Sequence, residues 1–309
     1  MKKYIISDLH GNGEVYDSIM GYLDNVSLVE DIELYINGDL IDRGLDGFRM
    51  LNDVIDRINN KDSFKIHYLG GNHELMMYQA LKKRKPGGSI NHFCDWMNNG
   101  GWIIEGELDA LEDESMIDNY KDFLGELELY KKFDEKINDN NILLVHASAP
   151  YEVHDNCHLK IKDDNDEVED VVWKREWEYG GFFFPEPLYK NNLKKDGYFI
   201  IKGHTPLKEL QGFVYDAEQN FMNIDGGCAY YATGNFDADH IPLVEVKDNK
   251  LEILIFNHNN EIIDGYYFDG EVTTMSEEDL SKKDIFIDHK YDNCSEKNKT
   301  LIKELLLIE

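Results

Sequence analysis

The sequence predicts an α/β fold in which two β-sheets stack and helices flank them. Over residues 1–78, apolar strand patterns alternate with helical patterns at intervals of about 30 residues, which is typical of βαβ units in a largely parallel sheet. From about residue 197 the strands become closely spaced, which favours antiparallel pairing into a second sheet on the first. Between these regions, residues 84–136 are charged and apolar at helical spacing, which predicts a helical insertion.

Five apolar runs, each followed at once by a polar block, give the main expected strands. They are YII at 4–6, IELYI at 32–36, KIHYL at 65–69, NILLV at 141–145 and YFII at 198–201. In α/β sheets, ligands and catalytic groups gather at the carboxyl ends of the strands. The polar blocks that follow the runs are therefore candidate functional segments.

Helices are expected after the first three strands, because residues 14–25, 46–59 and 75–81 carry apolar side chains at helical spacing. The acidic segment 162–170 lacks the glycine and the terminal Glu of a calcium-binding loop and is expected to be a solvated loop.

The C-terminal third contains four short strand patterns with turn residues at Asn220 and at Asp248-Asn249. The patterns are YFIIKG, FMNIDGG, IPLVEV and LEILIF. Beyond Asn257 the chain is polar and without motifs. We expect one domain over residues 1–258 and a C-terminal extension of unknown role over 259–309, in which KTLIKELLLIE is a candidate docking helix.

Composition restricts the classes of partner. The 309-residue chain is 42% hydrophobic, as a globular protein is, and its 62 acidic against 32 basic residues give a formal net charge of −30. Such a field repels polyanions, which makes long nucleic acid an unlikely partner. No apolar run approaches the roughly 20 residues needed to cross a bilayer, so we expect no membrane contact.

The four cysteines are single and far apart, at positions 94, 157, 228 and 294. Their spacing argues against a disulfide framework and against a structural zinc site, and it favours the reducing cytoplasm. The sequence says nothing about oligomeric state.

The polar blocks contain the ligands of a metal centre. The blocks are SDLHG at 7–11, GDLIDRG at 38–44, GNHE at 71–74, VHASAP at 145–150 and GHTP at 203–206. Their candidate ligands are oxygen and imidazole donors with no thiolate: Asp8, His10, Asp39, Asn72, His146 and His204. A lone His at a strand end is more often structural. Five such blocks in order, with six donors and a carboxylate able to bridge, favour a centre with two metal ions.

The five blocks together resemble the PPP-type branch of the calcineurin-like metallophosphatases, whose signature reads GDxHG, GDxxDRG, GNHE, an H after a strand, and a later GH. This branch includes serine/threonine protein phosphatases and their bacterial and phage relatives. The resemblance spans residues 1 to about 258 and implies a four-layer αββα fold. Ser7 and Gly226 depart from the family pattern, which commonly has Gly and Thr there.

The resemblance implies a role for each site residue. Asp8, His10 and Asp39 would hold one metal ion, and Asp39, Asn72, His146 and His204 the other. Arg43 and Arg175 would bind the phosphate, His73 would act as the general acid, and Asp42 would orient His73. Two divalent ions are implied, with manganese favoured and iron or zinc as alternatives.

The implied reaction is in-line attack on phosphorus by a metal-bridging hydroxide, without a covalent phosphoenzyme. We expect a phosphomonoesterase that acts on phosphoserine and phosphothreonine in proteins. The first alternative is symmetrical hydrolysis of dinucleoside polyphosphates such as diadenosine tetraphosphate, a small phosphorylated substrate. RNA-end phosphatase or cyclic phosphodiesterase activity ranks third, and a catalytically silent metal-binding module, which would be expected to have lost a ligand, ranks last.

Overall fold

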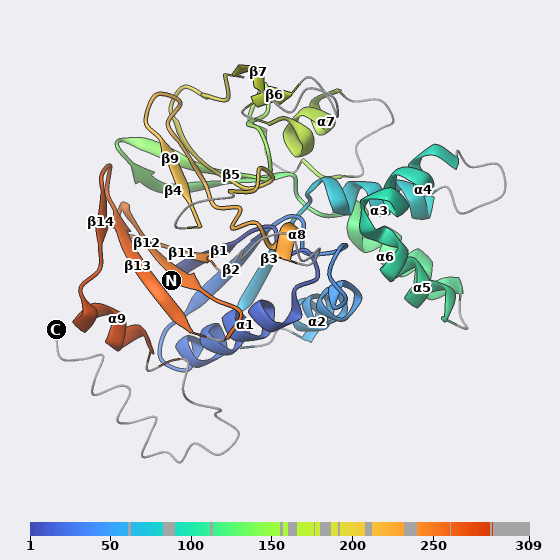
Figure 1. Ribbon diagram of the computed structural model, residues 1–309, viewed down its shortest axis with the longest axis horizontal. Coiled ribbons are helices and arrows are strands. Elements are labelled where there is room, and N and C mark those ends of the chain that lie inside the picture. The colour runs from blue at the N-terminus through green and yellow to red at the C-terminus, as the bar shows by residue number, and fades with distance from the viewer. Residues whose placement is uncertain are drawn as a thin grey trace, which may run out of the picture.

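The protein folds into two mixed β-sheets that lie face to face, with helices on their outer sides (Figure 1). The arrangement confirms the predicted fold class. The computed structural model describes residues 1–60, 63–82, 90–111, 114–154, 157–159, 166–175, 177–179, 187–190, 192–207, 212–231, 240–259, 261–284 and 286.

The larger sheet has the strand order β14-β13-β12-β11-β1-β2-β3. Its parallel part is β1 (Lys2–Ile6), β2 (Ile32–Asn37) and β3 (Lys65–Leu69), which correspond to the first three predicted strands. Its antiparallel part consists of β11 (Ile241–Lys247), β12 (Lys250–Phe256), β13 (Ile262–Phe268) and β14 (Val272–Thr274).

The smaller sheet has the order β4-β5-β8-β10-β9. Its strands are β4 (Tyr130–Ile137), β5 (Asn140–Val145), β8 (Tyr198–Lys202), β9 (Val214–Asp216) and β10 (Phe221–Asn223). β5 and β8 run parallel, so their carboxyl ends lie at the same edge. A separate hairpin joins β6 (Trp177–Tyr179) to β7 (Pro187–Lys190).

The assignment of IPLVEV and LEILIF to the second sheet was wrong. These segments form β11 and β12, and β11 pairs antiparallel with β1 in the larger sheet, with Ile5 opposite Val244. All residues from Ile241 to Val246 are buried, so the strand occupies a central position that local patterning does not identify. The pairing of β8 with β10 is parallel rather than antiparallel. The predicted turn at Asp248-Asn249 is confirmed, and both residues have the positive φ of a tight hairpin.

Side chains on successive residues of β1 alternate between two cores. Ile5 lies between the sheets, whereas Tyr4 and Ile6 pack in a second cluster with Ile19 of α1 (Gly13–Ser27). Helices α1 and α2 (Gly47–Asn60) cover the outer face of the larger sheet (Figure 1), as the helical patterns predict.

The outer face of the smaller sheet is covered in the same way. On β5, Ile142 and Leu144 face the larger sheet, whereas Leu143 and Val145 belong to the cluster that contains Val171 of α7 (Asp166–Trp173). Helix, sheet, sheet and helix thus follow one another as four layers. Because α7 begins at Asp166, the prediction of a solvated loop over 162–170 was wrong for its last five residues, and 162–165 lie outside the described residues.

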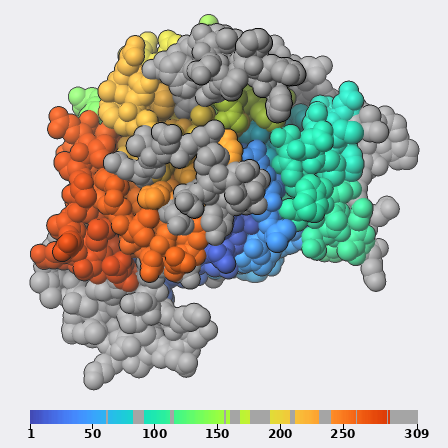
Figure 2. All heavy atoms as spheres, viewed as in Figure 1, coloured from blue at the N-terminus to red at the C-terminus, as the bar shows by residue number. Residues whose placement is uncertain are grey.

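The insertion between β3 and β4 is helical, as predicted, but shorter. After α3 (Asn72–Lys82) it contains α4 (Ile90–Trp96), a π-helical turn η1 (Met97–Gly101), α5 (Trp102–Asp109) and α6 (Glu114–Gly125). The expectation of helix up to residue 136 was wrong, because β4 starts at Tyr130. Its buried Tyr130, Phe133 and Ile137 point into the core between exposed lysines and acids, and the strand pairs with β5. We call α4–α6 the helical lobe; it stands out beside the N-terminal third of the chain (Figure 2).

The larger sheet continues past residue 258, the predicted end of the domain, because β13 and β14 add to it. Helix α9 (Glu277–Asp284) then packs on this sheet, and Lys283 Nζ lies 2.7 Å from Glu252 Oε2. Asn25 Nδ2 donates to the carbonyl of Phe286 at 2.5 Å. Residues 262–284 and Phe286 therefore belong to the same compact unit. The KTLIKELLLIE segment lies outside the described residues.

A search of the described residues finds no helix that is both long and apolar enough to cross a membrane.

We expect that Ile253→Ala lowers the free energy of unfolding by about 2–5 kcal/mol, because Ile253 is fully buried between the sheets and truncation leaves a cavity. The matched change Ile263→Ala in the neighbouring strand, where the side chain is 39% exposed, should cost less than about 1 kcal/mol. Urea unfolding followed by circular dichroism measures both. Equal losses for the two variants would contradict the proposed inter-sheet core.

Candidate metal centre

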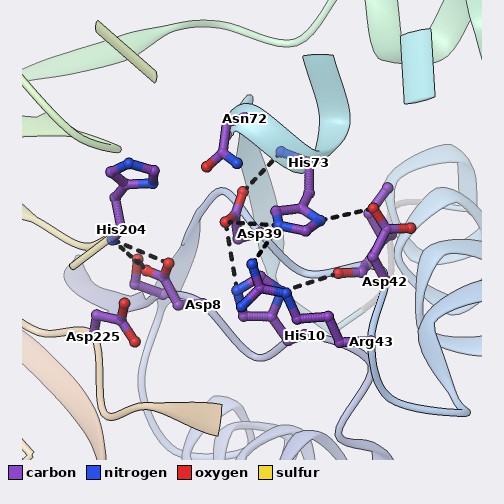
Figure 3. A network of polar contacts seen from close by, with 12 residues as sticks. Asp8, His10, Asp39, Asp42, Arg43, Asn72, His73, His204 and Asp225 are labelled. Atoms are coloured by element: carbon purple, nitrogen blue, oxygen red, sulfur yellow. Dashed lines mark hydrogen bonds and ion pairs between the residues drawn. The ribbon is translucent and has the colours of Figure 1, made fainter. Parts of the chain in front are cut away.

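The carboxyl ends of five strands meet in one place (Figure 3). In the larger sheet, β1 leads to Asp8 and His10, β2 to Asp39, and β3 to α3, which begins at Asn72. The loops after β1 and β2 run side by side: the amide of His10 donates to the carbonyl of Asp39 at 2.9 Å. In the smaller sheet, β5 leads to His146 and β8 to His204, two parallel neighbours.

Asn37 joins the two sheets at this edge. Its side-chain amide donates to the carbonyl of Val145 at 3.0 Å, and its own carbonyl lies 2.9 Å from Nδ1 of His146. Asn37 is completely buried, so both contacts are shielded from water. The smaller sheet is thereby held in register with the strand ends of the larger one.

Six candidate site residues have a left-handed backbone, with φ between 46° and 69°. They are Asp8, His10, Asp39, Asp42, Arg43 and His204. Such φ values are uncommon outside glycine and concentrate at functional sites, where the surrounding structure must stabilise them. The strand ends are therefore bent sharply where their side chains have to converge.

Two groups of three donors share one carboxylate. Ligand atoms of His10, Asp39 and His73 lie within 4.8 Å of one another, and so do those of Asp39, His146 and His204. A carboxylate common to two donor groups is the arrangement that a bridged pair of cations requires. The predicted bridging position of Asp39 thus agrees with the geometry.

Asp8 and Asn72, the remaining predicted ligands, lie beside these groups. Both oxygens of Asp8 accept from the amide of His204, at 3.0 and 3.1 Å, and Oδ1 of Asn72 lies 3.1 Å from Nε2 of His146. All six predicted ligands are at least 97% buried. The structure therefore brings all of them to one site.

Three of the imidazoles are oriented by backbone carbonyls. Nδ1 of His10 lies 3.3 Å from the carbonyl of Ile41, Nδ1 of His146 contacts Asn37 as above, and Nε2 of His204 lies 2.9 Å from the carbonyl of Trp173. Because a carbonyl only accepts, each of these nitrogens carries a hydrogen, and the other ring nitrogen is directed into the site. This is the usual orientation of histidine ligands of a metal ion.

His73 differs, because its Nδ1 donates to a carboxylate, Asp42 Oδ2, at 2.7 Å. Its Nε2 lies 3.1 Å from a guanidinium nitrogen of Arg43. Because a guanidinium only donates, Nε2 accepts this hydrogen bond, and the neighbouring positive charge disfavours a metal ion at Nε2. The contact with Arg43 therefore distinguishes His73 from the other three rings, although its atoms fall within ligand distance.

The buried donors need a cation for electrostatic reasons. Nε2 of His146 faces two oxygens, Oδ1 of Asn72 at 3.1 Å and Oδ1 of Asp39 at 3.4 Å. Burial lowers the pKa of His146, but the carboxylates of Asp39 and Asp8 outweigh it and raise the pKa to about 10. Without a metal ion, a proton on His146 satisfies the oxygens. This donor set fits a divalent cation.

The other pKa shifts agree with this interpretation. Burial, then the charge of Arg43, lowers the pKa of His10, and burial, then Arg175, lowers that of His204, so both rings are neutral and available as ligands. Burial raises the pKa of Asp8 to about 6, with Asp39 adding to the rise. Two neutral imidazoles and a carboxyl group are a donor set that a divalent cation can bind.

The two predicted arginines lie on opposite parts of the site. Arg43 contacts His73, and NH1 of Arg175 donates to the carbonyl of His204 at 2.7 Å. Both side chains are partly exposed, so they can reach a ligand that enters from solvent. The fold thus brings two arginines that are far apart in the sequence to the same site.

Glu74 is a site residue to which the sequence analysis assigned no role. Its fully buried carboxylate accepts from the amides of Asp39 at 2.8 Å, Leu40 at 3.1 Å and Gly71 at 2.9 Å, and from the hydroxyl of Tyr68 at 2.7 Å. The turn that carries Asp39 is thereby fixed to the start of α3. In the sequence, only its position at the end of the GNHE block indicates that Glu74 belongs to the site.

Two further site residues came from outside the main blocks. Trp96, in the helical lobe, donates to both oxygens of Asp42, at 3.0 and 3.1 Å, and is completely buried. Asp225 lies near Asp8 (Figure 3), and burial, then the charge of Asp8, raises its pKa well above the usual range. Asp225 lies in the NIDGG segment, a pattern that indicates a site residue. No local sequence pattern indicates a role for Trp96.

Comparison with known proteins places these features in a family. A family model described as calcineurin-like phosphoesterase matches residues 1–226. A protein serine/threonine phosphatase from Saccharomyces cerevisiae is similar, with 15% identity, a TM-score of 0.49, and coverage of 83% of this chain and 80% of that chain. A cold-active protein-tyrosine phosphatase from a psychrophilic Shewanella species has 16% identity and a TM-score of 0.45, with coverage of 89% and 80%. A search of curated protein sequences finds no match.

We expect that Glu74→Gln lowers the affinity for Mn²⁺ by about 10–100-fold. The amide group has one accepting oxygen and cannot satisfy the three backbone donors on both sides of the carboxylate, so the turn with Asp39 shifts. Calorimetric titration with Mn²⁺ measures the affinity, and circular dichroism verifies the fold.

Tyr68→Phe is the matched control, because it removes only the hydroxyl hydrogen bond to Glu74 and leaves the three backbone donors in place. Its Mn²⁺ affinity should fall by less than about fivefold. Wild-type affinity in folded Glu74→Gln would show that the carboxylate does not fix the position of Asp39.

Proposed function

This chain belongs to the calcineurin-like phosphoesterase family, and we propose that within it the protein is a binuclear-metal-dependent phosphomonoesterase of phosphoserine and phosphothreonine in proteins. Membership makes it a metal-dependent phosphatase. The substrate, the metals and the role of each residue are the proposed part.

The proposal rests above all on the different partners of the four histidines. His10, His146 and His204 are oriented by backbone carbonyls. Nε2 of His73 instead faces the guanidinium of Arg43, which disfavours a metal ion there, and Asp42 at Nδ1 can support the ring as a proton donor. One site thus combines ligands for cations with a separate proton donor. Hydrolysis of a phosphate ester requires both.

Asp8, His10 and Asp39 would hold one divalent ion, and Asp39, Asn72, His146 and His204 would hold a second. Bound metal ions supply Lewis-acid stabilisation of phosphoryl oxygens and lower the pKa of water. Oxygen and imidazole donors without thiolate suit manganese, with iron or zinc as alternatives. The described cysteines 94, 157 and 228 are free, which supports a cytoplasmic location.

The chain's own residues would bind the phosphate and complete the proton transfer. Arg43 and Arg175 bind phosphoryl oxygens through their guanidinium groups, which present paired donors to such oxygens. The Nε2 hydrogen of protonated His73 passes to the leaving alkoxide of Ser or Thr. Asp42 holds the ring through Nδ1 and stabilises its positive charge until the proton has left.

The charge of the chain favours a phosphoprotein over a dinucleoside polyphosphate. At a net charge of −30, the protein's field opposes the approach of a highly anionic small molecule more strongly than that of a protein segment with a single phosphate and neighbouring cations. Hydrolysis of diadenosine tetraphosphate remains the second candidate. RNA ends are disfavoured for the same electrostatic reason.

We expect that His73→Asn lowers kcat for a phosphothreonine peptide by about 10²–10⁴-fold, with Mn²⁺ content unchanged. The loss should be much smaller for p-nitrophenyl phosphate, because nitrophenolate leaves without protonation. Steady-state kinetics and metal analysis test this, with His154→Asn, whose side chain is 59% exposed, as the control. Loss of bound Mn²⁺ together with equal losses on both substrates would identify His73 as a metal ligand instead.

A rate panel with Mn²⁺ tests the substrate class. Phosphopeptides, diadenosine tetraphosphate, RNA with 2′,3′-cyclic ends and p-nitrophenyl phosphate are compared by kcat/KM. We expect the phosphopeptides to be hydrolysed most efficiently among the biological substrates. A preference of several orders of magnitude for the dinucleotide would overturn the choice of a protein substrate.

A further inference from the structure

Two large apolar side chains lie exposed next to a phosphate-binding arginine. Leu45 is 80% exposed and follows Arg43 by two residues, and Trp102, the first residue of α5, is 63% exposed. Side chains of this size are exposed in only a few places among the described residues.

Contacts of the backbone place the segments that carry Leu45 and Trp102 close to Arg43. A Cβ placed on Gly100 would lie 2.7 Å from the amide nitrogen and 3.0 Å from Cα of Arg43. A Cβ placed on Gly47 would lie 3.4 Å from Cδ1 of Ile104. Leu45 is two residues from Arg43, and Trp102 is two residues from Gly100, which packs on the backbone of Arg43, so both exposed side chains belong to segments next to this arginine. We call this pair the apolar rim.

The rim is held by buried neighbours, so its position is fixed. Ile104 and Leu108 of α5 are completely buried, and Tyr120 of α6 donates to Asn52 Oδ1 of α2 at 2.6 Å. The helical lobe thus packs on α2, and the two rim side chains remain exposed.

From these observations we propose that the apolar rim binds an apolar side chain of the phosphorylated protein, two residues from the phosphorylated Ser or Thr. This inference rests on the proposed protein phosphatase function. Leu45 Cα lies at most about 7 Å from Arg43 Cα, which is the span of two residues of an extended peptide. In an extended peptide, residues two apart point to the same side, so both can face the enzyme.

Charge selects a peptide rather than a nucleotide base as the occupant of the rim. Residues 90–125, which contain the helical lobe, have nine acidic residues and a single basic one, Lys121. A base attached to a polyphosphate would bring several negative charges against this lobe, whereas basic residues that flank a phosphorylation site are attracted to it. The rim therefore fits an apolar residue within a basic peptide.

Phosphothreonine heptapeptides in an alanine background test the proposal with the Mn²⁺-loaded full chain. We expect Phe two residues from the phosphothreonine to lower KM about tenfold relative to Gly, with kcat unchanged, because the ring leaves water on the rim. Phe one residue away, which points to the opposite side, should give no gain. Flanking Lys should lower KM and flanking Glu should raise it, and added salt should reduce this difference.

Trp102→Ala and Leu45→Ser should each abolish most of the preference for Phe over Gly while leaving the kinetics of the Gly peptide unchanged. Leu28→Ser is the matched control, because Leu28 is 42% exposed at the C-terminal end of α1, away from the site. It should retain the preference.

An unchanged preference for Phe in both rim variants would overturn the inference and leave the phosphatase function intact. A rise in KM for diadenosine tetraphosphate alone would assign the rim to a nucleotide base and also overturn it. If no phosphopeptide is hydrolysed while the dinucleotide is, the inference and the protein-substrate part of the proposed function both fall, but the metal-dependent phosphatase stands.

Discussion

The carboxylate of Asp39 has to reach donor groups from both sheets, and the buried carboxylate of Glu74 fixes it there. Glu74 gathers the amides of Asp39, Leu40 and Gly71 around itself, so the end of β2 and the start of α3 form one turn. No side chain fits at Gly71, since a Cβ would lie 2.3 Å from Oδ1 of Asp39. A small displacement here would separate the two donor groups, because they share only this residue.

Two carboxylates this close together and out of water have an electrostatic consequence. Burial and then the charge of Asp39 raise the pKa of Glu74, while burial raises the pKa of Asp39 less than its histidine neighbours, His146 first, lower it. The negative charge of Asp39 is therefore stabilised by the imidazoles, and the carboxylate of Glu74 is stabilised by backbone donors. The two donor groups share the charge of Asp39, which is what a pair of cations needs at its centre.

Much of this could be predicted from the sequence, because the information is local. A strand followed by Asp-x-His, or by GNHE, places donors at a sheet edge whatever the rest of the chain does. The position of β11 beside β1, and the hydrogen bonds from Trp96 to Asp42, depend on pairing between residues more than 50 positions apart. No periodicity encodes such pairing. The role of Glu74 was overlooked for another reason: GNHE marks the residue, but three of its four partners are backbone amides, which a sequence pattern does not identify.

The helical lobe connects the proton donor to the proposed rim. Trp96 holds Asp42, which holds His73, and four residues later Gly100 packs against the backbone of Arg43. The next exposed side chain is Trp102. One short segment from Trp96 to Trp102 thus supports His73 through Asp42, contacts Arg43 and forms half of the rim. Substitutions in the lobe that move this segment should therefore alter substrate preference and proton transfer together. Those on the outer surface of α6, which none of these contacts involves, should alter neither.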